Sequence, residues 1–455
     1  MKKIIVIGGG AAGAKAASKA KRLNPNNQVD LYTQYDKIAF SLCGLPYFIE
    51  GSVSDINKLI IKTPSDFEKM GINVYLNHEL QKIYPENKCV LINSNHIFYD
   101  ELILALGAKV HIPPIENINL KNVFHLRDLE DGLAIKEKMK NSSSVLIIGG
   151  GYIAIELVEA FLVNGLKVIL VEVNEKLAHD FDSDFSDLIF NTIQNHSKDN
   201  LEIHLSCEIN HFTYNQEDNS FKSAISSNGK EFFADFCVLA TGAIPNVEVA
   251  KNSGVHIGIT GGIEVDNKMR TNFENIYACG DCVQKTCIIT RQPCYVGLGS
   301  TANKEGRVAA LSADGASCCE VFDGVLNSVI TRFFDFTFSK TGLTIKKAKE
   351  YAQFVNLEPI FYTVTKKDKA GYMPDANELT IKVVADKRSG ELLGAQAIGY
   401  SQNVLPRINT ITSLLKSRST VDDLLHLDLP YSPPYSATID PILTCAYKLK
   451  DMIKK

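Results

Sequence analysis

The residue best suited to sulfur chemistry in this sequence is Cys43, in the stretch FSLCGLPY. Pro46 follows it closely, and proline is favoured in the first turn of a helix. We therefore expect Cys43 to open a helix, where the helix dipole would lower the pKa of the thiol and favour the thiolate. The alternative is a buried structural thiol, because cysteine is among the residue types most often buried.

The other cysteines of the chain, which has 11 in all, point to packing. Their number is odd and their spacing irregular, and no secretory signal is apparent, so we expect free thiols in a reducing cytoplasm. Cys279 and Cys282 form a C-x-x-C pair, but no second pair completes a zinc site. We expect no metal centre, and we assign this pair and the adjacent Cys318 and Cys319 to packing.

A glycine-rich turn follows an apolar run at the N-terminus, in KKIIVIGGGAAGAKAASKAKRL. Gly8, Gly10 and Gly13 fit G-x-G-x-x-G, whose glycines let the backbone approach a pyrophosphate at a helix N-terminus. The next strand, QVDLYT, ends at Thr33 where an acidic residue is usual, so Thr33 or Gln34 is the expected ribose contact. Taken alone, this motif is weak, because glycine-rich turns also arise for steric reasons.

The same pattern recurs in SSVLIIGGGYIAIELVEAFL, with Gly149, Gly151 and Ala154 in the fingerprint positions. The strand KVILVE then ends at Glu172, about 20 residues further on. A carboxylate at that position binds the hydroxyls of an adenosine ribose and repels a 2′-phosphate. The second site therefore predicts NADH, with NADPH less favoured.

Two nucleotide sites need two α/β units, and later segments must complete them. The stretches DELILALGA, FCVLATGAIPN and IYACGD each join an apolar strand to a glycine turn, as at crossovers between domains. We predict an α/β fold with two Rossmann-like domains, the second inserted in the first, and a C-terminal α+β domain. In that last domain, strands such as ELTIKVVAD and LLGAQAIG precede a helix over 406–416. The predicted boundaries are 1–110 with 243–322 for the first domain, 111–242 for the second and 323–455 for the third.

The two glycine turns, ATGAIPN and IYACGD together resemble the FAD-dependent pyridine nucleotide–disulfide oxidoreductases over nearly the whole chain. The resemblance implies FAD on the first domain, NAD(P)H on the second and homodimerisation through the third. Relatives with an internal dithiol carry C-x-x-x-x-C, but Phe48 stands at the second position here. The stretch SLCGLPYFIEG instead resembles the single-cysteine branch, which contains coenzyme A-disulfide reductases, NADH oxidases and NADH peroxidases.

Two features separate the members of that branch. The oxidases and peroxidases carry a histidine where this chain has Ala11, and LDLPYSPPYSATIDP resembles a Tyr-x-Pro-Pro-Tyr signature of coenzyme A-disulfide reductases. The resemblance therefore implies an enzyme that uses NADH to reduce coenzyme A disulfide, or a related small disulfide or persulfide, through Cys43. One alternative is an NADH oxidase or peroxidase with a sulfenic acid at Cys43. Another is a flavin-poor redox sensor or scaffold, for which Thr33 is the support.

The resemblance also implies roles for single residues. Tyr431 and Tyr372 would reach Cys43 from the partner subunit, Asp281 would bind the ribityl chain, and Tyr152 would gate the nicotinamide pocket. The further cofactor contacts expected on this basis are Ala11, Ala12, Leu80, Gly107, Ala108, Arg127, Ile153, Glu156, Gly242, Gly280, Leu298, Gly299 and Ser300. Leu42 and Asn303 are expected to contact the substrate.

Three cations lie on the first predicted helix. Lys15, Lys19 and Arg22 are spaced by four and three residues, which puts them on one helix face. Such a cluster can hold the phosphorylated end of coenzyme A, and the alternative is a solvated helix surface. The net charge of −4 gives no basic field for nucleic acid or a membrane surface, and no segment has the uncharged length to span a bilayer.

Overall fold

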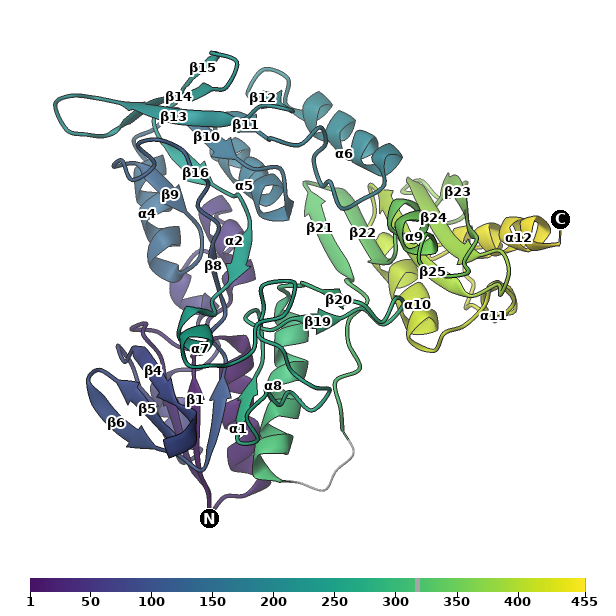
Figure 1. The fold of residues 1–455 in the computed structure, drawn as a ribbon. Helices are drawn as coiled ribbons and strands as arrows, with labels where there is room; N and C mark the ends of the chain where they lie inside the picture. The colour runs from purple at the N-terminus through teal and green to yellow at the C-terminus, as the bar shows by residue number, and fades with distance from the viewer. Residues whose placement is uncertain (316–319, 455) are drawn as a thin grey trace.

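Three lobes make up the molecule, and each is built on its own sheet (Figure 1). The computed structural model describes residues 1–315 and 320–454. The predicted packing role of Cys318 and Cys319 therefore lies outside the described residues. The first lobe holds the N-terminus, the second contains the middle of the chain, and the C-terminal part forms the third.

The first lobe is built on a five-stranded sheet whose neighbouring strands are all parallel. Its central strand, IIVI, is buried on both faces, as a parallel sheet requires. The last strand in sequence, β18, pairs with β7, so the chain leaves this sheet and later returns to it. This arrangement confirms that one domain is inserted in the other. The sheet order is β18 (Ile276–Ala278), β7 (Glu101–Leu104), β1 (Lys3–Ile7), β2 (Gln28–Tyr32) and β3 (Ile72–Tyr75).

Two helices that pack against each other support the nucleotide side of this sheet: α1 (Ala11–Leu23) and α8 (Gly299–Asp314). The sequence of α1 is rich in alanine, the best helix former, and its buried face carries Ala16, Ala17 and Ala20. A Cβ at Gly306 would collide with the carbonyl oxygen of Ala12, so only glycine allows this close helix approach. The pair thereby fixes the N-terminus of α1 beside the first glycine turn.

Smaller elements complete the first lobe. Leu80, at the start of the antiparallel sheet β4-β5-β6, packs in a buried cluster with Ile7 and Tyr32. The short helices include η1 (Leu42–Gly44), which holds Cys43 and leads directly into α2. The remaining bounds are β4 (Leu80–Tyr84), β5 (Cys89–Ile92), β6 (Asn95–Phe98), β19 (Lys285–Thr286), β20 (Pro293–Cys294), α2 (Leu45–Glu50), α3 (Pro64–Glu68), α7 (Glu248–Asn252), η2 (Ile56–Leu59) and η3 (Pro85–Asn87).

The second lobe repeats the parallel plan with the strand order β12-β11-β10-β16-β9. Its helix α5 follows the second glycine turn and is buried over most of its length. An antiparallel sheet, β13-β14-β15, packs against strands β10 and β11 of the parallel sheet. The bounds are β9 (Val123–His125), β10 (Ser144–Ile148), β11 (Lys167–Val171), β12 (Leu201–His204), β13 (Ile209–Tyr214), β14 (Phe221–Ser226), β15 (Glu231–Phe233), β16 (Cys237–Leu239), α4 (Leu129–Met139), α5 (Tyr152–Val163) and α6 (Ser183–His196).

A two-stranded ribbon joins the first two lobes. Strand β8 (Ala108–Val110) pairs with β17 (Ala243–Pro245) in antiparallel register. The residues just before these strands, Gly107 and Gly242, both have positive φ, as a sharp change of chain direction requires. The ribbon lies near the predicted boundaries at 110/111 and 242/243, which stay predictions.

The C-terminal lobe is an antiparallel sheet in the order β21-β22-β25-β24-β23. Strand β24 spans the predicted ELTIKVVAD, and the predicted helix over 406–416 begins two residues earlier, at Val404. Helices α10, α11 and α12 share one core with the sheet. The bounds are β21 (Val329–Phe333), β22 (Phe336–Gly342), β23 (Pro359–Lys367), β24 (Glu378–Asp386), β25 (Leu392–Gly399), α9 (Ile345–Ala352), α10 (Val404–Lys416), α11 (Val421–Leu425) and α12 (Pro441–Ile453).

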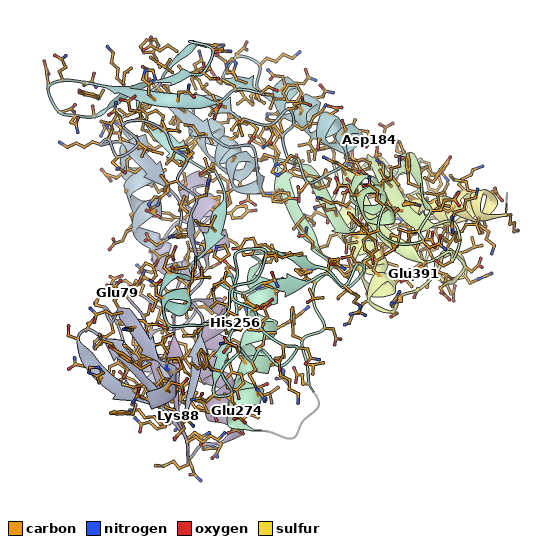
Figure 2. All side chains as sticks on the ribbon, viewed as in Figure 1. Glu79, Lys88, Asp184, His256, Glu274 and Glu391 are labelled. Atoms are coloured by element: carbon orange, nitrogen blue, oxygen red, sulfur yellow. The ribbon has the colours of Figure 1, made fainter. Side chains whose placement is uncertain are left out.

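The second and C-terminal lobes meet where α6 begins, near Asp184 (Figure 2). Phe181 and Phe185 of the second lobe share one buried cluster with Phe336 and Phe338 of β22. Across residues 1–315 and 320–454, no helix is long and apolar enough to cross a membrane. The same residues contain no group of three or more His, Cys, Asp or Glu side chains arranged to hold a metal ion.

Candidate active site

Cys43 lies at the surface of the first lobe, in the 3₁₀ turn η1 that leads into α2. Of the nine cysteines in the described part of the chain, it alone is exposed, and six are buried. The alternative of a buried structural thiol at Cys43 is therefore wrong. Cys279 and Cys282 are both buried, and burial raises the pKa of each thiol, as expected of packing residues.

The expectation of a lowered thiol pKa at Cys43 is wrong for the chain itself. The pKa of Cys43 is raised, chiefly because neighbouring protein removes water from the thiol. The carboxylates of Glu156 and Asp281 raise it further, and the Arg127 guanidinium opposes them. The helix after Cys43 is only six residues long, so its dipole is too small to outweigh two carboxylates. Their effect on the thiol pKa shows that Glu156, Asp281 and Arg127 all lie near Cys43.

The first glycine turn combines two tight positions with one open position. A Cβ at Gly8 would collide with the carbonyl oxygen of Ala105, and one at Gly13 with that of Gly8. A Cβ at Gly10 would meet nothing within 4 Å. No side chain caps the N-terminus of α1, so its first N–H groups face that open space. An anion such as a pyrophosphate fits there.

The second turn has the same arrangement. A Cβ at Gly149 would collide with the carbonyl oxygen of Ala240, whereas Gly151 is open. Glu172 is buried at the end of β11, and its Oε1 accepts a hydrogen bond from the Asn174 backbone N–H at 2.6 Å. Its Oε2 lies 2.8 Å from where a Cβ of Gly150 would stand. The carboxylate therefore sits beside the turn, where a ribose fits and a 2′-phosphate is repelled.

The expected ribose contacts of the first domain differ in accessibility. Thr33 is buried, and its Oγ1 accepts a hydrogen bond from the Tyr35 N–H at 3.4 Å, whereas Gln34 is exposed. Leu80 is buried in the core of the lobe. Of these three side chains, Gln34 is therefore the one free to meet a ligand from solvent.

A charged pair joins the segment before α4 to the turn after β18. Arg127 Nη2 donates to Asp281 Oδ2 at 3.1 Å, and Arg127 Nε donates to the carbonyl oxygen of Ala108 at 3.1 Å. The hydroxyl of Tyr295 is buried without a hydrogen-bond partner, and Asp281 raises the pKa of Tyr295 after burial, so the two lie close together. Sequence reasoning missed Tyr295, because this residue belongs to no motif. An unpaired buried hydroxyl beside Asp281 fits a polar ligand, as the FAD expectation requires.

The other residues expected to contact a cofactor or the substrate lie in the turn before Asp281, at the start of α8 and at positions that differ in exposure. Gly280 has positive φ, and its N–H donates to Glu305 Oε2 at 2.7 Å, which holds the turn before Asp281. Helix α8 begins after Leu298 without a side-chain cap, and Asn303 Nδ2 donates to the Gly299 carbonyl at 3.0 Å. The exposed positions are Ala11, Gly299, Ser300, Asn303, Gly242 and Ile153, whereas Ala12 is buried and Leu42 half-buried.

Glu156 of α5 contacts the C-terminal lobe, whereas Tyr152 of α5 bonds to Asp180 of its own lobe. Thr331 Oγ1 donates to Glu156 Oε1 at 2.7 Å, and burial raises the pKa of Glu156. The Tyr152 hydroxyl donates to Asp180 at 2.8 Å. Thr331 and Asp180 are further site residues that sequence reasoning missed, because neither belongs to a glycine-turn motif.

Tyr372 and Tyr431 are brought together by the fold, but on a different lobe from Cys43. Desolvation, and after it the Tyr431 hydroxyl, raises the pKa of Tyr372, so the two hydroxyls are neighbours. Tyr372 is 75% exposed and Tyr431 49%. Both belong to the C-terminal lobe, whereas Cys43 lies in the first. Their predicted contact with Cys43 through a partner subunit stays a prediction.

Two of the three cations on the basic face of α1 already interact with other groups of the protein. Arg22 is exposed and its Nε donates to the Ser18 carbonyl at 3.1 Å, while Lys15 and Lys19 are half-buried. The positive charge of Lys19 helps to lower the pKa of Glu320, whose main partner is Arg307. The anion site and the solvated surface therefore both remain as interpretations of this face.

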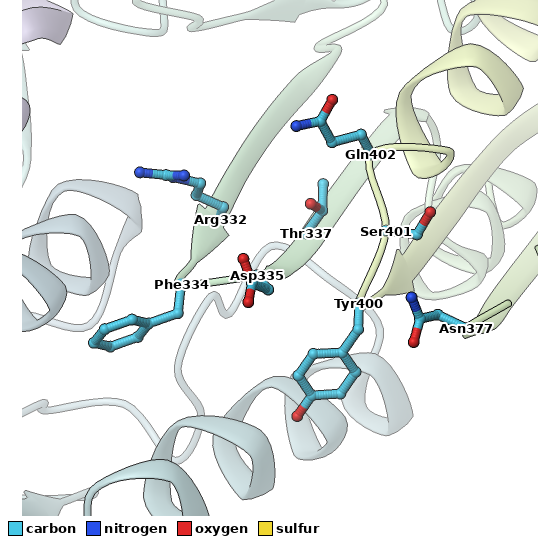
Figure 3. A pocket seen from close by; sticks show the side chains of 8 residues that line it. All are labelled: Arg332, Phe334, Asp335, Thr337, Asn377, Tyr400, Ser401 and Gln402. Atoms are coloured by element: carbon cyan, nitrogen blue, oxygen red, sulfur yellow. The ribbon is translucent and has the colours of Figure 1, made fainter. Parts of the chain in front are cut away.

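A pocket of about 410 Å³ lies on the C-terminal lobe (Figure 3). Arg332, which lines this pocket, lies over the ring of Tyr47 in α2, at 5.7 Å from the ring centroid. The pocket therefore lies close to α2. The described residues that line this pocket include no cysteine. The lining residues are Arg332, Phe334, Asp335, Thr337, Asn377, Tyr400, Ser401 and Gln402.

Comparison with known proteins places the chain in one family. Residues 2–306 match the model "Pyridine nucleotide-disulphide oxidoreductase", and residues 329–441 match the dimerisation domain of the same group. A relative from Pyrococcus horikoshii, named NAD(P)H coenzyme A polysulfide/persulfide reductase, is 35% identical and covers 99% of this chain and 98% of its own. A relative from Methanocaldococcus jannaschii, named NADH oxidase, is 30% identical over 99% of this chain and 98% of its own.

Solved structures give the same result. A NAD-dependent persulfide reductase from A. fulgidus has a TM-score of 0.92 and 33% identity, covering 99% of this chain and 83% of that one. The reduced CoADR-RHD of Bacillus anthracis has a TM-score of 0.93 and 29% identity, covering 100% of this chain and 81% of that one. These matches confirm the predicted fold class. The chain belongs to the pyridine nucleotide-disulphide oxidoreductase family, whose members are flavoenzymes that use FAD and NAD(P)H.

Proposed function

We propose that this protein uses NADH to reduce coenzyme A disulfide, or a related small disulfide or persulfide, through Cys43. The observation that carries the proposal is the exposure of Cys43 between the Arg127–Asp281 pair and Glu156. A thiol in that position is open to a substrate and has a cation and two carboxylates as neighbours. The name of the Pyrococcus horikoshii relative supports coenzyme A persulfides and polysulfides as substrates.

The residues of the first lobe fit FAD, and those of the second fit NADH. The open space at Gly10, the uncapped N-terminus of α1, Arg127, Asp281 and the unpaired Tyr295 hydroxyl would hold the flavin nucleotide. Gly149, Gly151 and Glu172 would hold NADH. When bound, the flavin supplies the transfer of an electron pair from NADH to sulfur.

The chain's own part in the reaction is thiol–disulfide exchange. The Cys43 thiolate attacks one sulfur of a disulfide R–S–S–R, which forms Cys43–S–S–R and releases one thiolate. Reduction of the mixed disulfide by two electrons and one proton restores the Cys43 thiolate and releases the second thiol. The overall balance is NADH, one proton and one disulfide to NAD⁺ and two thiols.

Glu156 and Arg127 would control the proton at the Cys43 sulfur. Arg127 lowers the thiol pKa and favours the nucleophilic thiolate, whereas an ionised Glu156 favours the protonated thiol. Because burial raises the pKa of Glu156, this carboxyl holds its proton more tightly than an exposed one. Thr331 occupies its Oε1, which leaves Oε2 to exchange a proton.

Residues outside this cluster would complete the substrate-binding site. Lys15, Lys19 and Arg22 would hold the phosphates of coenzyme A. In a homodimer, Tyr431 and Tyr372 of the C-terminal lobe would reach the partner's active site and donate to the leaving thiolate. Their segments are tied together, because Arg407 Nη2 donates at 2.8 Å both to the Asp368 carbonyl and to Asp440 Oδ2.

A comparison of cysteine variants tests the proposal. Wild-type enzyme with FAD is expected to oxidise NADH when coenzyme A disulfide is added, and Cys43→Ser to lose this activity by a factor of at least about 10³, since the nucleophile is gone. Cys287→Ser is the matched control, because that thiol is half-buried and free. Full disulfide reductase activity in Cys43→Ser would overturn the proposal. Rapid NADH oxidation by oxygen alone, unaffected by the disulfide, would favour an NADH oxidase.

A further inference from the structure

Three polar side chains form a row across the C-terminal sheet. Lys340 of β22 is paired in register with Gln396 of β25, and Gln396 with Lys382 of β24. All three residues are at most 4% exposed. Two lysines buried this deeply in a sheet require partners, since an unpaired buried ammonium is very costly.

Their partners are three alternate aspartates of the second lobe, in the segment Asp180–Asp184. Asp180 Oδ2 lies 2.7 Å from Lys340 Nζ, and Asp184 Oδ1 lies 2.6 Å from Lys382 Nζ. Between them, Asp182 accepts from Lys382 at 3.2 Å and from Gln396, and its own N–H donates to Gln396 Oε1 at 2.8 Å. Asp182 is the N-cap residue of α6 and Asp184 lies in its first turn, so the start of this helix brings both carboxylates to the sheet. Figure 2 marks this junction at Asp184.

The segment also holds the first residue after the second glycine turn. The Tyr152 hydroxyl donates to both oxygens of Asp180 at 2.8 Å, and its ring packs against Phe181 and Phe338. Asp180 therefore has two partners, Tyr152 from the nucleotide side and Lys340 from the C-terminal sheet. With the ring held there, no described atom beyond the neighbouring residues in the chain lies within 4 Å of the place where a Cβ of Gly151 would stand. A dinucleotide on this turn would occupy that space.

We propose that Asp180 and Lys340 are positioning residues for NADH binding, which act by holding the Tyr152 ring away from the second glycine turn. Lys340 holds Asp180 in place through their ion pair, and a carboxylate makes a stronger hydrogen bond to the tyrosine than a neutral acceptor does. Without this contact the ring is free to turn over the open side of Gly151 and compete with NADH. The inference rests on NADH use, but it does not depend on which disulfide is reduced.

The test is a double-mutant cycle on NADH affinity in the FAD-loaded enzyme. Asp180→Ala is expected to raise the NADH dissociation constant about three- to tenfold, the range for losing one hydrogen bond of typical strength. The same substitution in a Tyr152→Ala background is expected to change nothing further, because no ring is left to move. Lys340→Met is expected to weaken NADH binding in the same direction, and Asp180→Glu to restore it in part.

Asp184→Asn is the matched control. It removes one carboxylate of the same interlobe contact, paired with Lys382, but it does not touch Tyr152. We expect unchanged NADH affinity and a small loss of thermal stability. Equal losses of NADH affinity in Asp180→Ala and Asp184→Asn, or additive effects of Asp180→Ala and Tyr152→Ala, would overturn the positioning role. Failure of the disulfide proposal alone would leave these NADH affinities as predicted.

Discussion

At the scale of single residues, the reactivity of Cys43 depends on the charges around it. Desolvation is the main cause that raises the pKa of the Cys43 thiol, the carboxylates of Glu156 and Asp281 raise it further, and Arg127 lowers it. The sequence motif after Cys43 predicted a helix, and the structure has one, but the short helix does not decide the thiol pKa. The charged side chains that shift this pKa beyond the effect of desolvation come from three distant parts of the sequence.

Substitution of the charged neighbours should move the thiol pKa in opposite directions. Glu156→Gln removes a negative charge that raises the pKa of Cys43, so the thiolate should form at lower pH than in wild type. Arg127→Met removes the charge that lowers this pKa, so the thiolate should form at higher pH. The rate of Cys43 alkylation against pH, measured on reduced enzyme with Cys43→Ser as blank, checks both shifts. Coincident profiles for the three proteins would contradict this electrostatic account.

At the scale of elements, two strand–turn–helix units do most of the positioning. Gly8 and Gly13 let α1 pack tightly against the first sheet, and Gly10 leaves the helix N-terminus open. The three glycines therefore have different tasks although they belong to one motif. The backbone of Gly10 is extended, with φ −74° and ψ −167°, a conformation that any residue adopts.

Alanine at two positions of the first turn should separate folding from cofactor binding. Gly13→Ala places a Cβ against the Gly8 carbonyl and should destabilise the protein by about 1–3 kcal/mol, the usual cost of overpacking. Gly10→Ala meets no protein atom and should leave the flavin-free protein as stable as wild type, but with at least tenfold weaker FAD binding. Thermal unfolding of the flavin-free proteins and FAD titration measure the two effects. Normal FAD affinity in Gly10→Ala would place the pyrophosphate elsewhere.

At the scale of the whole molecule, the site lies where segments far apart in the sequence meet. The glycine turns, Glu172 and the inserted domain could be predicted, because each depends on a local pattern or on strand order. The Tyr295 hydroxyl, Thr331 and the contact of Asp180 with Lys340 could not. They depend on how lobes pack and on the register of β22, β24 and β25, which no local pattern of apolar residues reveals.

The most direct test of the central claim is the intact mass of the enzyme after exposure to coenzyme A disulfide, before and after a reductant. We expect wild-type protein to carry one coenzyme A through a reductant-sensitive bond, and Cys43→Ser to carry none. That result would establish the mixed disulfide at Cys43. Wild-type protein that stays unmodified, or that gains one oxygen in place of coenzyme A, would contradict the account and indicate sulfenic acid chemistry at this cysteine.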